Sequence, residues 1–316
     1  MNDSSFIFKL LTDLLAYLEL PMDEKYDLTP SFLLQVPIHY AQKIEKGNPL
    51  DPLLLQILPL LEENKQKPGF TKDPVGDLNA TQEPGILQKY NARALVISTC
   101  ACSLHCRFCF RKHFNYESTE ALPDRLDRWL ANHPDIKEII FSGGDPLFTS
   151  PAFFKKLNDS VLKHETVKTI RFHSRLPVTD PDRLEPLLPI LKTIPSQKNA
   201  ILVSHVNHAQ ELDEKSSALY KTLREAGFTL LNQSVLLRGI NDTVKALVDL
   251  SNQLFSQGVL PYYLHQLDKA EGTSHFEVPD HKAIHLLENI RIELPGYLVP
   301  RLVREIANEK SKTPLC

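Results

Sequence analysis

Short apolar runs rich in β-branched residues alternate with longer amphipathic segments through the last two thirds of the chain. The apolar runs occupy residues 94–99, 138–142, 167–174, 200–205, 228–236 and 259–265. The segments between them are long enough for crossover helices, which we expect at 120–132, 152–163, 181–192, 209–226 and 244–257. Strands that alternate with helices form parallel sheets, either open or curled. The pattern predicts an α/β fold, for which we expect an incomplete parallel (β/α)6 barrel of the TIM type.

The chain before residue 90 has a different pattern. Leucines at helical spacing predict a helix at 6–20, two more helices are expected at 30–46 and 49–63, and 67–85 is rich in turn residues. We therefore expect a helical lobe and its connection at 1–88, the partial barrel at 89–294 and a C-terminal segment at 295–316.

The composition excludes several classes of protein. The chain has 316 residues, 42% of them hydrophobic, which is enough for a substantial core. The formal net charge of −3 and the scattered basic residues do not favour nucleic-acid binding. No apolar run approaches the ~20 residues of a membrane span. Because the five cysteines do not form a disulfide framework, we expect a reducing compartment, the cytoplasm.

The most informative motif follows the first predicted strand, where Cys102, Cys106 and Cys109 are spaced by three and two residues. Soft thiolates favour iron–sulfur clusters, zinc or copper(I). Three protein ligands would leave one iron of a four-iron cluster open to chemistry.

A structural zinc site is the alternative, although zinc sites usually have four ligands. His105 or His113 could complete such a site locally. The two remaining cysteines, Cys100 and Cys316, do not supply the second cysteine pair of a typical zinc site. Cys100 could replace Cys102 in a set with Cys106 and Cys109, although we expect Cys100 to be buried at the end of the strand.

A second motif, Ser142-Gly143-Gly144-Asp145, follows the second predicted strand. Adjacent glycines let the backbone approach a ligand closely, and the aspartate adds an acceptor. The same residues also suit an ordinary strand-to-helix turn with an aspartate cap. Because the carboxyl ends of parallel strands share one edge, we expect this turn and the cysteine loop to face one cavity.

Together the two motifs resemble those of the radical S-adenosylmethionine superfamily. Arg111 and the runs 109–114, 232–237, 261–264 and 275–276 are similar to the lysine 2,3-aminomutase branch of that superfamily. The resemblance extends from about residue 45 to the C-terminus. It implies a [4Fe-4S] cluster on the three cysteines, and S-adenosylmethionine held by residues 142–145 and by Gln233.

The resemblance also implies a second cofactor, pyridoxal phosphate, and a substrate site. Lys312 matches the lysine that binds pyridoxal phosphate, and Tyr90 and Arg93 match residues around its ring and phosphate. Arg111 matches the residue that binds the substrate carboxylate. Asp268 and Glu305 match an acidic pair that binds the ε-ammonium of lysine, with glutamate replacing the usual aspartate at 305.

The reaction that this resemblance implies is the conversion of L-α-lysine to (R)-β-lysine by a 5′-deoxyadenosyl radical, with migration of the amine from C2 to C3. An electron donor such as flavodoxin or ferredoxin is implied, and a homodimer is possible. The similarity is greatest to family members that supply β-lysine to the ligase pathway modifying a lysine of elongation factor P, notably at 45–52, 89–90, 106–114 and 296–315.

Two other functions remain open on the residues alone. A radical enzyme with another substrate, or without pyridoxal phosphate, would keep both motifs but not need Lys312. A zinc-stabilised adaptor without catalytic activity would need only the cysteines. His173, His205, His208 and His265 lie at or near predicted strand ends, where one or two could contact a cofactor. For each of them we favour a core or rim histidine with satisfied hydrogen bonds.

Overall fold

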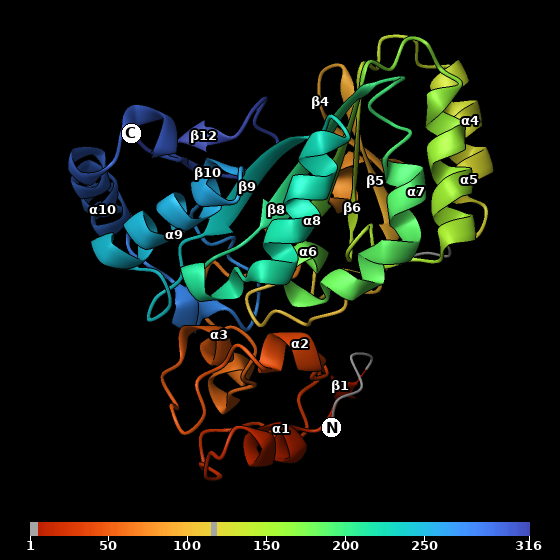
Figure 1. Cartoon of the computed structure of the whole chain (residues 1–316). Coiled ribbons are helices and arrows are strands. Elements are labelled where there is room, and N and C mark those ends of the chain that lie inside the picture. Colours follow the sequence, from red (N-terminus) through yellow and green to blue (C-terminus); the bar gives the residue numbers. More distant parts are fainter. Residues whose placement is uncertain (1–5, 115–118) are drawn as a thin grey trace.

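In the computed structural model, which describes residues 6–114 and 119–316, one twisted sheet runs through most of the chain (Figure 1). Ten described strands pair in the order β3 to β12, and the seven from β5 to β11 are parallel. The antiparallel strands β3, β4 and β12 lie at its ends. Among the described residues β3 and β12 are the edges of the sheet, so the barrel is incomplete. The strands are β3 Thr81–Glu83, β4 Ile86–Tyr90, β5 Arg93–Thr99, β6 Glu138–Gly143, β7 Thr169–Ser174, β8 Asn199–His205, β9 Thr229–Val235, β10 Leu260–His265, β11 Arg301–Arg304 and β12 Thr313–Pro314.

All six predicted strands are confirmed as β5 to β10, and helices follow them as expected. The α-helices of the barrel are α4 Leu122–Ala131, α5 Pro151–Leu162, α6 Leu176–Thr179, α7 Leu188–Leu191, α8 Glu214–Glu225, α9 Val244–Ser256 and α10 Asp280–Glu293. Short 3-10 turns are η3 Pro181–Leu187, η4 Ala209–Glu211, η5 Ser274–Phe276 and η6 Gly296–Leu298. The single helix predicted at 181–192 is wrong, because Pro186 lies inside it and the segment divides into η3 and α7.

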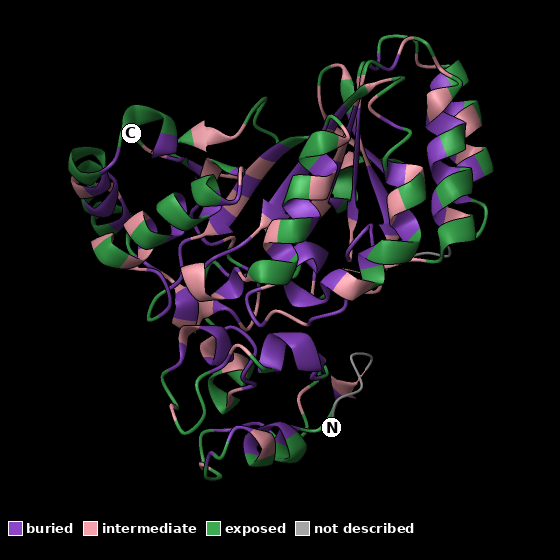
Figure 2. Cartoon of the chain, in the orientation of Figure 1, coloured by how far each residue is buried: buried purple, intermediate pink, exposed green. Residues whose placement is uncertain are grey.

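Alternation along the strands separates a helix-covered face from a concave face. In β7, Ile170 and Phe172 belong to the main core under the helices, whereas Arg171 and His173 alternate with them. Figure 2 shows the buried strands inside a layer of helices whose outer surfaces are exposed. The concave face is therefore where polar side chains gather.

The N-terminal lobe is less helical than predicted. Its elements are β1 Ile7–Phe8, α1 Leu11–Tyr17, β2 Val36–Pro37, α2 Ile38–Ala41, α3 Pro52–Leu55, η1 Leu61–Asn64 and η2 Leu78–Ala80. The helices expected at 6–20, 30–46 and 49–63 are much shorter, because β1 pairs with β2 and prolines such as Pro37 and Pro59 interrupt the segments. The lobe has its own core, which includes Leu104 of the cysteine loop.

The proposed domain boundaries fall within the sheet. The boundary between residues 88 and 89 lies inside β4, and 295–316 contributes β11 and β12. No helix of the described residues is both long and apolar enough to cross a membrane.

Asp51 ties the lobe to the barrel and generates a prediction about stability. Its buried carboxylate caps α3 at Leu53 N and Leu54 N, and accepts from the side chain of Gln210 at 2.7 Å. Replacing Asp51 with alanine should lower the free energy of unfolding by about 2–3 kcal/mol, since a cap and buried hydrogen bonds are lost. Chemical denaturation measures this.

The control is Asp13→Ala, which removes an exposed carboxylate from α1 and should change the stability by less than about 0.5 kcal/mol. Equal effects of the two substitutions would contradict the role of Asp51.

Candidate functional site

Three thiols are collected on the loop that follows β5. Cys102, Cys106 and Cys109 are partly buried, and their charges act on one another. Burial raises the pKa of all three thiols, that of Cys109 to about 11, with the neighbouring Cys106 adding to the shift. Such thiols become thiolates when a cationic metal site compensates their charge.

The other cysteines lie apart from this group. Cys100 and Cys316 are exposed. The expectation that Cys100 is buried is wrong, because β5 ends at Thr99 and the next residue is already on the loop surface. Within the part of the chain that the structure describes, no three His, Cys, Asp or Glu side chains meet as ligands of a single metal ion.

The glycines of β6 support the cysteine loop directly. A Cβ at Gly143, whose φ is +118°, would lie 2.6 Å from Thr99 O, and one at Gly144 would lie 2.3 Å from Ala101 O. The backbones are also bonded, from Gly144 N to Thr99 O at 2.7 Å and from Asp145 N to Ala101 O at 2.8 Å. The glycine turn and the cysteine loop therefore form one unit, and in this structure the space that the glycines leave is filled by the loop backbone.

The carboxylate of Asp145 is buried and engaged within the protein. It accepts hydrogen bonds from Ser174 Oγ at 2.8 Å, Arg175 N at 2.8 Å and Leu176 N at 2.9 Å. Burial raises the pKa of Asp145, and these donors oppose the shift. Asp145 thus fixes the turn after β7, while its backbone supports the cysteine loop.

The lobe holds the cysteine loop from the opposite direction. His105 N donates to Gln35 O at 3.0 Å, and Arg107 N donates to Gln56 O at 2.9 Å. The guanidinium of Arg107 forms a bidentate pair with Glu63, at 2.8 and 2.6 Å. The loop is therefore clamped between the lobe and the sheet.

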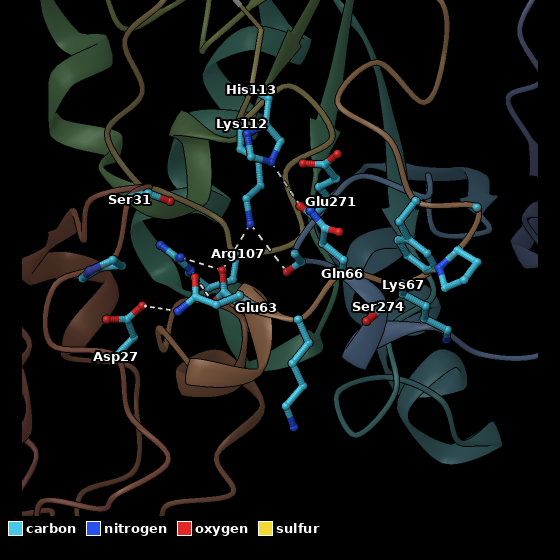
Figure 3. Close-up of a pocket in the computed structure, with 17 residues that line it drawn as sticks. Asp27, Ser31, Glu63, Gln66, Lys67, Arg107, Lys112, His113, Glu271 and Ser274 are labelled. Carbon is cyan, nitrogen blue, oxygen red and sulfur yellow. Dashed lines mark hydrogen bonds and ion pairs between the residues drawn. The ribbon is translucent and has the colours of Figure 1, made fainter.

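A cavity of about 630 Å³ lies beside this clamp (Figure 3). Figure 3 shows the carboxylate of Glu63 between Arg107 and Lys112. Lys112 Nζ is 3.1 Å from Glu63 Oε2. None of the residues expected to bind cofactor or substrate lines this cavity.

Polar side chains with unused hydrogen-bonding capacity lie at the carboxyl ends of neighbouring strands. His173 Nε2 in β7 and His205 Nε2 in β8 are buried and have no hydrogen-bond partner in the described part of the chain, and Gln233 Nε2 in β9 is 3.5 Å from His173 Nδ1. Burial lowers the pKa of both histidines, that of His205 to about 3, so both rings are neutral. The expectation that these two histidines are fully satisfied is wrong, because their second nitrogens face no protein acceptor.

Lys312, near the C-terminus, pairs with Glu305, which follows β11. Lys312 Nζ is 2.8 Å from Glu305 Oε2, and Tyr90 OH donates to Glu305 Oε1 at 2.6 Å. Burial raises the pKa of Glu305, but Lys312 and Tyr90 outweigh it and the net pKa is lowered. Lys312 also lies 5.8 Å from the ring of Tyr263. Arg93 is exposed and stacks on the Tyr90 ring at 5.3 Å.

Arg111 is oriented by two groups. Its Nε donates to Asp77 at 2.7 Å and its NH1 donates to Ser142 Oγ at 3.0 Å. Lys89 lies 2.6 Å from the other oxygen of Asp77. Burial alone would raise the pKa of Asp77, but Arg111 and Lys89 hold it below its usual value.

Asp268 is the exception in this charged region. It follows β10 and is partly exposed, but its Oδ1 is buried and has no hydrogen-bond partner among the described residues. Burial raises the pKa of Asp268 to about 7, with Lys312 opposing the shift and Glu305 adding to it. A buried carboxylate oxygen without a donor is costly, so this position is suited to an incoming cation.

The structure therefore brings most of the predicted residues into connected groups of contacts. Lys312, Glu305, Tyr90 and Asp268 act on one another, and Arg111 joins Ser142 at the end of β6. Sequence reasoning missed Asp77, whose turn carries no motif, and gave Lys89 no role in the site, although the resemblance includes it. The strand-end rule does point to His173 and His205, but does not separate them from His208 and His265.

The comparisons with known proteins agree with this geometry. The model of the radical SAM superfamily matches residues 96–197. A protein named L-lysine 2,3-aminomutase from Escherichia coli is 43% identical over 287 residues, covering 90% of this chain and 83% of that protein. Proteins of the same name from Haemophilus influenzae and Clostridium subterminale are 40% and 31% identical, covering 95% and 96% of this chain and 90% and 74% of their own lengths.

The close approach at Gly144 generates a prediction. Gly144→Ala should lower the free energy of unfolding by roughly 2 kcal/mol, because backbone must move to admit the methyl group. It should also reduce the iron bound after anaerobic reconstitution. Denaturation and iron analysis measure the two effects.

Gly296→Ala is the matched control, since a Cβ there meets nothing within 4 Å. If Gly144→Ala retained iron and stability as well as this control, the loop would not depend on the close approach.

Proposed function

Because this chain belongs to the lysine 2,3-aminomutase family of radical SAM enzymes, we propose that it converts L-α-lysine to (R)-β-lysine and uses pyridoxal phosphate to do so. The observation that carries the substrate assignment is the Oδ1 atom of Asp268, a buried carboxylate oxygen without a donor among the described residues, near a second acid, Glu305. An amino acid with a cationic side chain satisfies this arrangement, whereas an acidic side chain would add like charge to it.

The chain's own residues fit both cofactors. Soft thiols on one loop suit an iron–sulfur cluster held by Cys102, Cys106 and Cys109. The unpartnered nitrogens of His173 and His205 offer hydrogen-bonding groups on the concave face, where S-adenosylmethionine would bind beside residues 142–145 and Gln233.

Lys312, Tyr90 and Arg93 would hold pyridoxal phosphate. A primary amine beside the ring of Tyr263 supports the assignment of Lys312. When bound, S-adenosylmethionine on the cluster supplies a 5′-deoxyadenosyl radical, and pyridoxal phosphate supplies a π-system that stabilises the rearranging radical.

The protein residues position the substrate and do not themselves transfer protons to it. Asp268, with Glu305, binds the ε-ammonium at one end, and Arg111 binds the carboxylate at the other. Asp77 and Ser142 keep the guanidinium of Arg111 in place. Two charged anchors of opposite sign define the orientation of lysine and bring one Cβ hydrogen to the radical.

We further propose that the β-lysine serves the ligase pathway that modifies a lysine of elongation factor P, and that the enzyme works in the cytoplasm with a small one-electron donor such as flavodoxin or ferredoxin. The resemblance at residues 45–52 and 296–315 supports this destination. The free state of the described cysteines suits a reducing compartment.

The direct test uses anaerobically purified and reconstituted protein, with lysine, S-adenosylmethionine and reductant, with and without pyridoxal phosphate. We expect β-lysine only when both cofactors are present. Cleavage of S-adenosylmethionine without β-lysine would reject the aminomutase assignment, and activity without pyridoxal phosphate would reject the second cofactor. Stoichiometric zinc without cluster absorbance would support an adaptor instead.

The pKa of Asp268 predicts how lysine binding depends on pH. Below about pH 7 the carboxyl is protonated and does not attract an ammonium, so kcat/KM for lysine should rise as the pH increases through this value. Asp268→Asn should raise KM for lysine at least about tenfold and remove this pH dependence. Steady-state kinetics between about pH 6 and about pH 8.5, on both sides of the pKa, measure both effects.

Asp249→Asn, on the exposed face of α9, is the control and should leave the profile unchanged. A profile of Asp268→Asn that still rises through pH 7 would assign the titration to another group.

Lys312 generates a second prediction. Lys312→Ala should abolish the visible absorbance of bound pyridoxal phosphate and the covalent label left by borohydride reduction, because no other assigned group supplies the amine. Lys310→Ala, two residues earlier and exposed, should leave both signals intact. Loss of the signals in the Lys310 variant alone would move the anchor to that position.

A further inference from the structure

A buried arginine reaches from the end of β7 to one of the three cysteines. Arg175 NH1 donates to Cys106 Sγ at 2.6 Å, and the side chain is 9% exposed. The backbone N–H of Arg175 is fixed by Asp145 at 2.8 Å. The arginine is therefore positioned by the same aspartate whose backbone supports the cysteine loop.

The lobe and the barrel both hold the rest of the guanidinium. Arg175 NH2 donates to Glu211 Oε2 in η4 at 2.8 Å, to Gln56 Oε1 at 2.6 Å and to Tyr40 OH at 3.3 Å. Gln56 and Tyr40 belong to the lobe, and the cation lies 5.5 Å from the Tyr40 ring. The guanidinium therefore has little freedom to turn away from the sulfur.

The acid in this network is also fully engaged. Glu211 is 0% exposed, and its Oε1 accepts from Asn207 N at 2.9 Å and His208 N at 3.1 Å. Burying an ion pair costs desolvation free energy, so such a pair is a weak explanation for stability alone. The hydrogen bond from Arg175 to Cys106 indicates that this ion pair acts on the cysteine ligand.

We propose that Arg175 is a positioning residue for the iron–sulfur cluster, whose charged hydrogen bond orients the Cys106 ligand and raises the reduction potential of the cluster. Hydrogen bonds to cluster sulfurs and nearby positive charge stabilise the reduced form. In the reduction, the [4Fe-4S]2+ cluster takes one electron from an external donor and becomes [4Fe-4S]+. The lobe takes part, because Gln56 and Tyr40 hold the guanidinium. The inference concerns the cluster alone and does not depend on pyridoxal phosphate or lysine.

The test compares variants that lose either the cation in contact with Cys106 or the anion behind it. The double variant Arg175→Met/Glu211→Gln removes the ion pair without leaving a buried charge unpaired, and should lower the midpoint potential. Glu211→Gln alone removes an anion and keeps the guanidinium, and should raise the potential. Gln56→Met, which loosens the guanidinium, should lower it by less than the double variant does.

The measurement is a redox titration of the reconstituted full-length protein, in which the electron paramagnetic resonance signal of [4Fe-4S]+ is followed and iron and sulfide are counted. Arg183→Met is the control, because that arginine is partly exposed and pairs with Asp180. The midpoint potential of this variant should equal that of the wild type. If the midpoint potential falls in the double variant and rises in Glu211→Gln alone, Arg175 tunes the cluster. A merely structural role of the ion pair would not give shifts of opposite sign.

Unchanged potentials in the double variant and in Glu211→Gln, or shifts of the same sign in both, would overturn the proposal. If the double variant fails to hold iron, Arg175→Lys replaces it. This variant keeps the charge but not the forked donor, and its potential should lie below that of the wild type; a potential equal to the wild type would also overturn the proposal. A midpoint potential of Gln56→Met equal to that of the wild type would contradict the part of the proposal that gives the lobe a role.

Discussion

The arrangement of this protein depends on how the cysteine loop is held. On one side the backbone of Thr99 and Ala101 packs so closely on Gly143 and Gly144 that no side chain fits between them. On the other side the lobe contributes backbone acceptors and the pair of Glu63 with Arg107. A loop with three thiols has little core of its own. Its conformation is therefore imposed by two partners that are distant in sequence.

The same turn that supports the loop also connects it to the next strand. Asp145 uses its backbone to hold the cysteine loop and its carboxylate to fix the turn that carries Arg175. This places a cation against Cys106. Metal sites commonly depend on such outer contacts as strongly as on the ligands themselves.

Charges at the open end of the sheet are divided into satisfied and unsatisfied groups. Asp77 and Glu305 have cationic partners from the chain, whereas Asp268 forms no ion pair with any described residue and its pKa is raised. A fully paired set would only stabilise the fold. The unpaired carboxylate, together with the unpartnered histidine nitrogens, gives this end of the sheet a free-energy gain when a ligand arrives.

The sequence by itself determined the six parallel strands, the cysteine triplet and the glycine turn, because periodicity and motif spacing are local properties of a chain. It did not determine the short helices of the lobe, where prolines and the β1–β2 pairing override the leucine pattern. Nor did it identify Arg175 or Asp77, which carry no motif of their own. Only the tertiary structure decided which charges are paired, since pairing joins residues as far apart as Arg175 and Gln56 and depends on burial that no local pattern records.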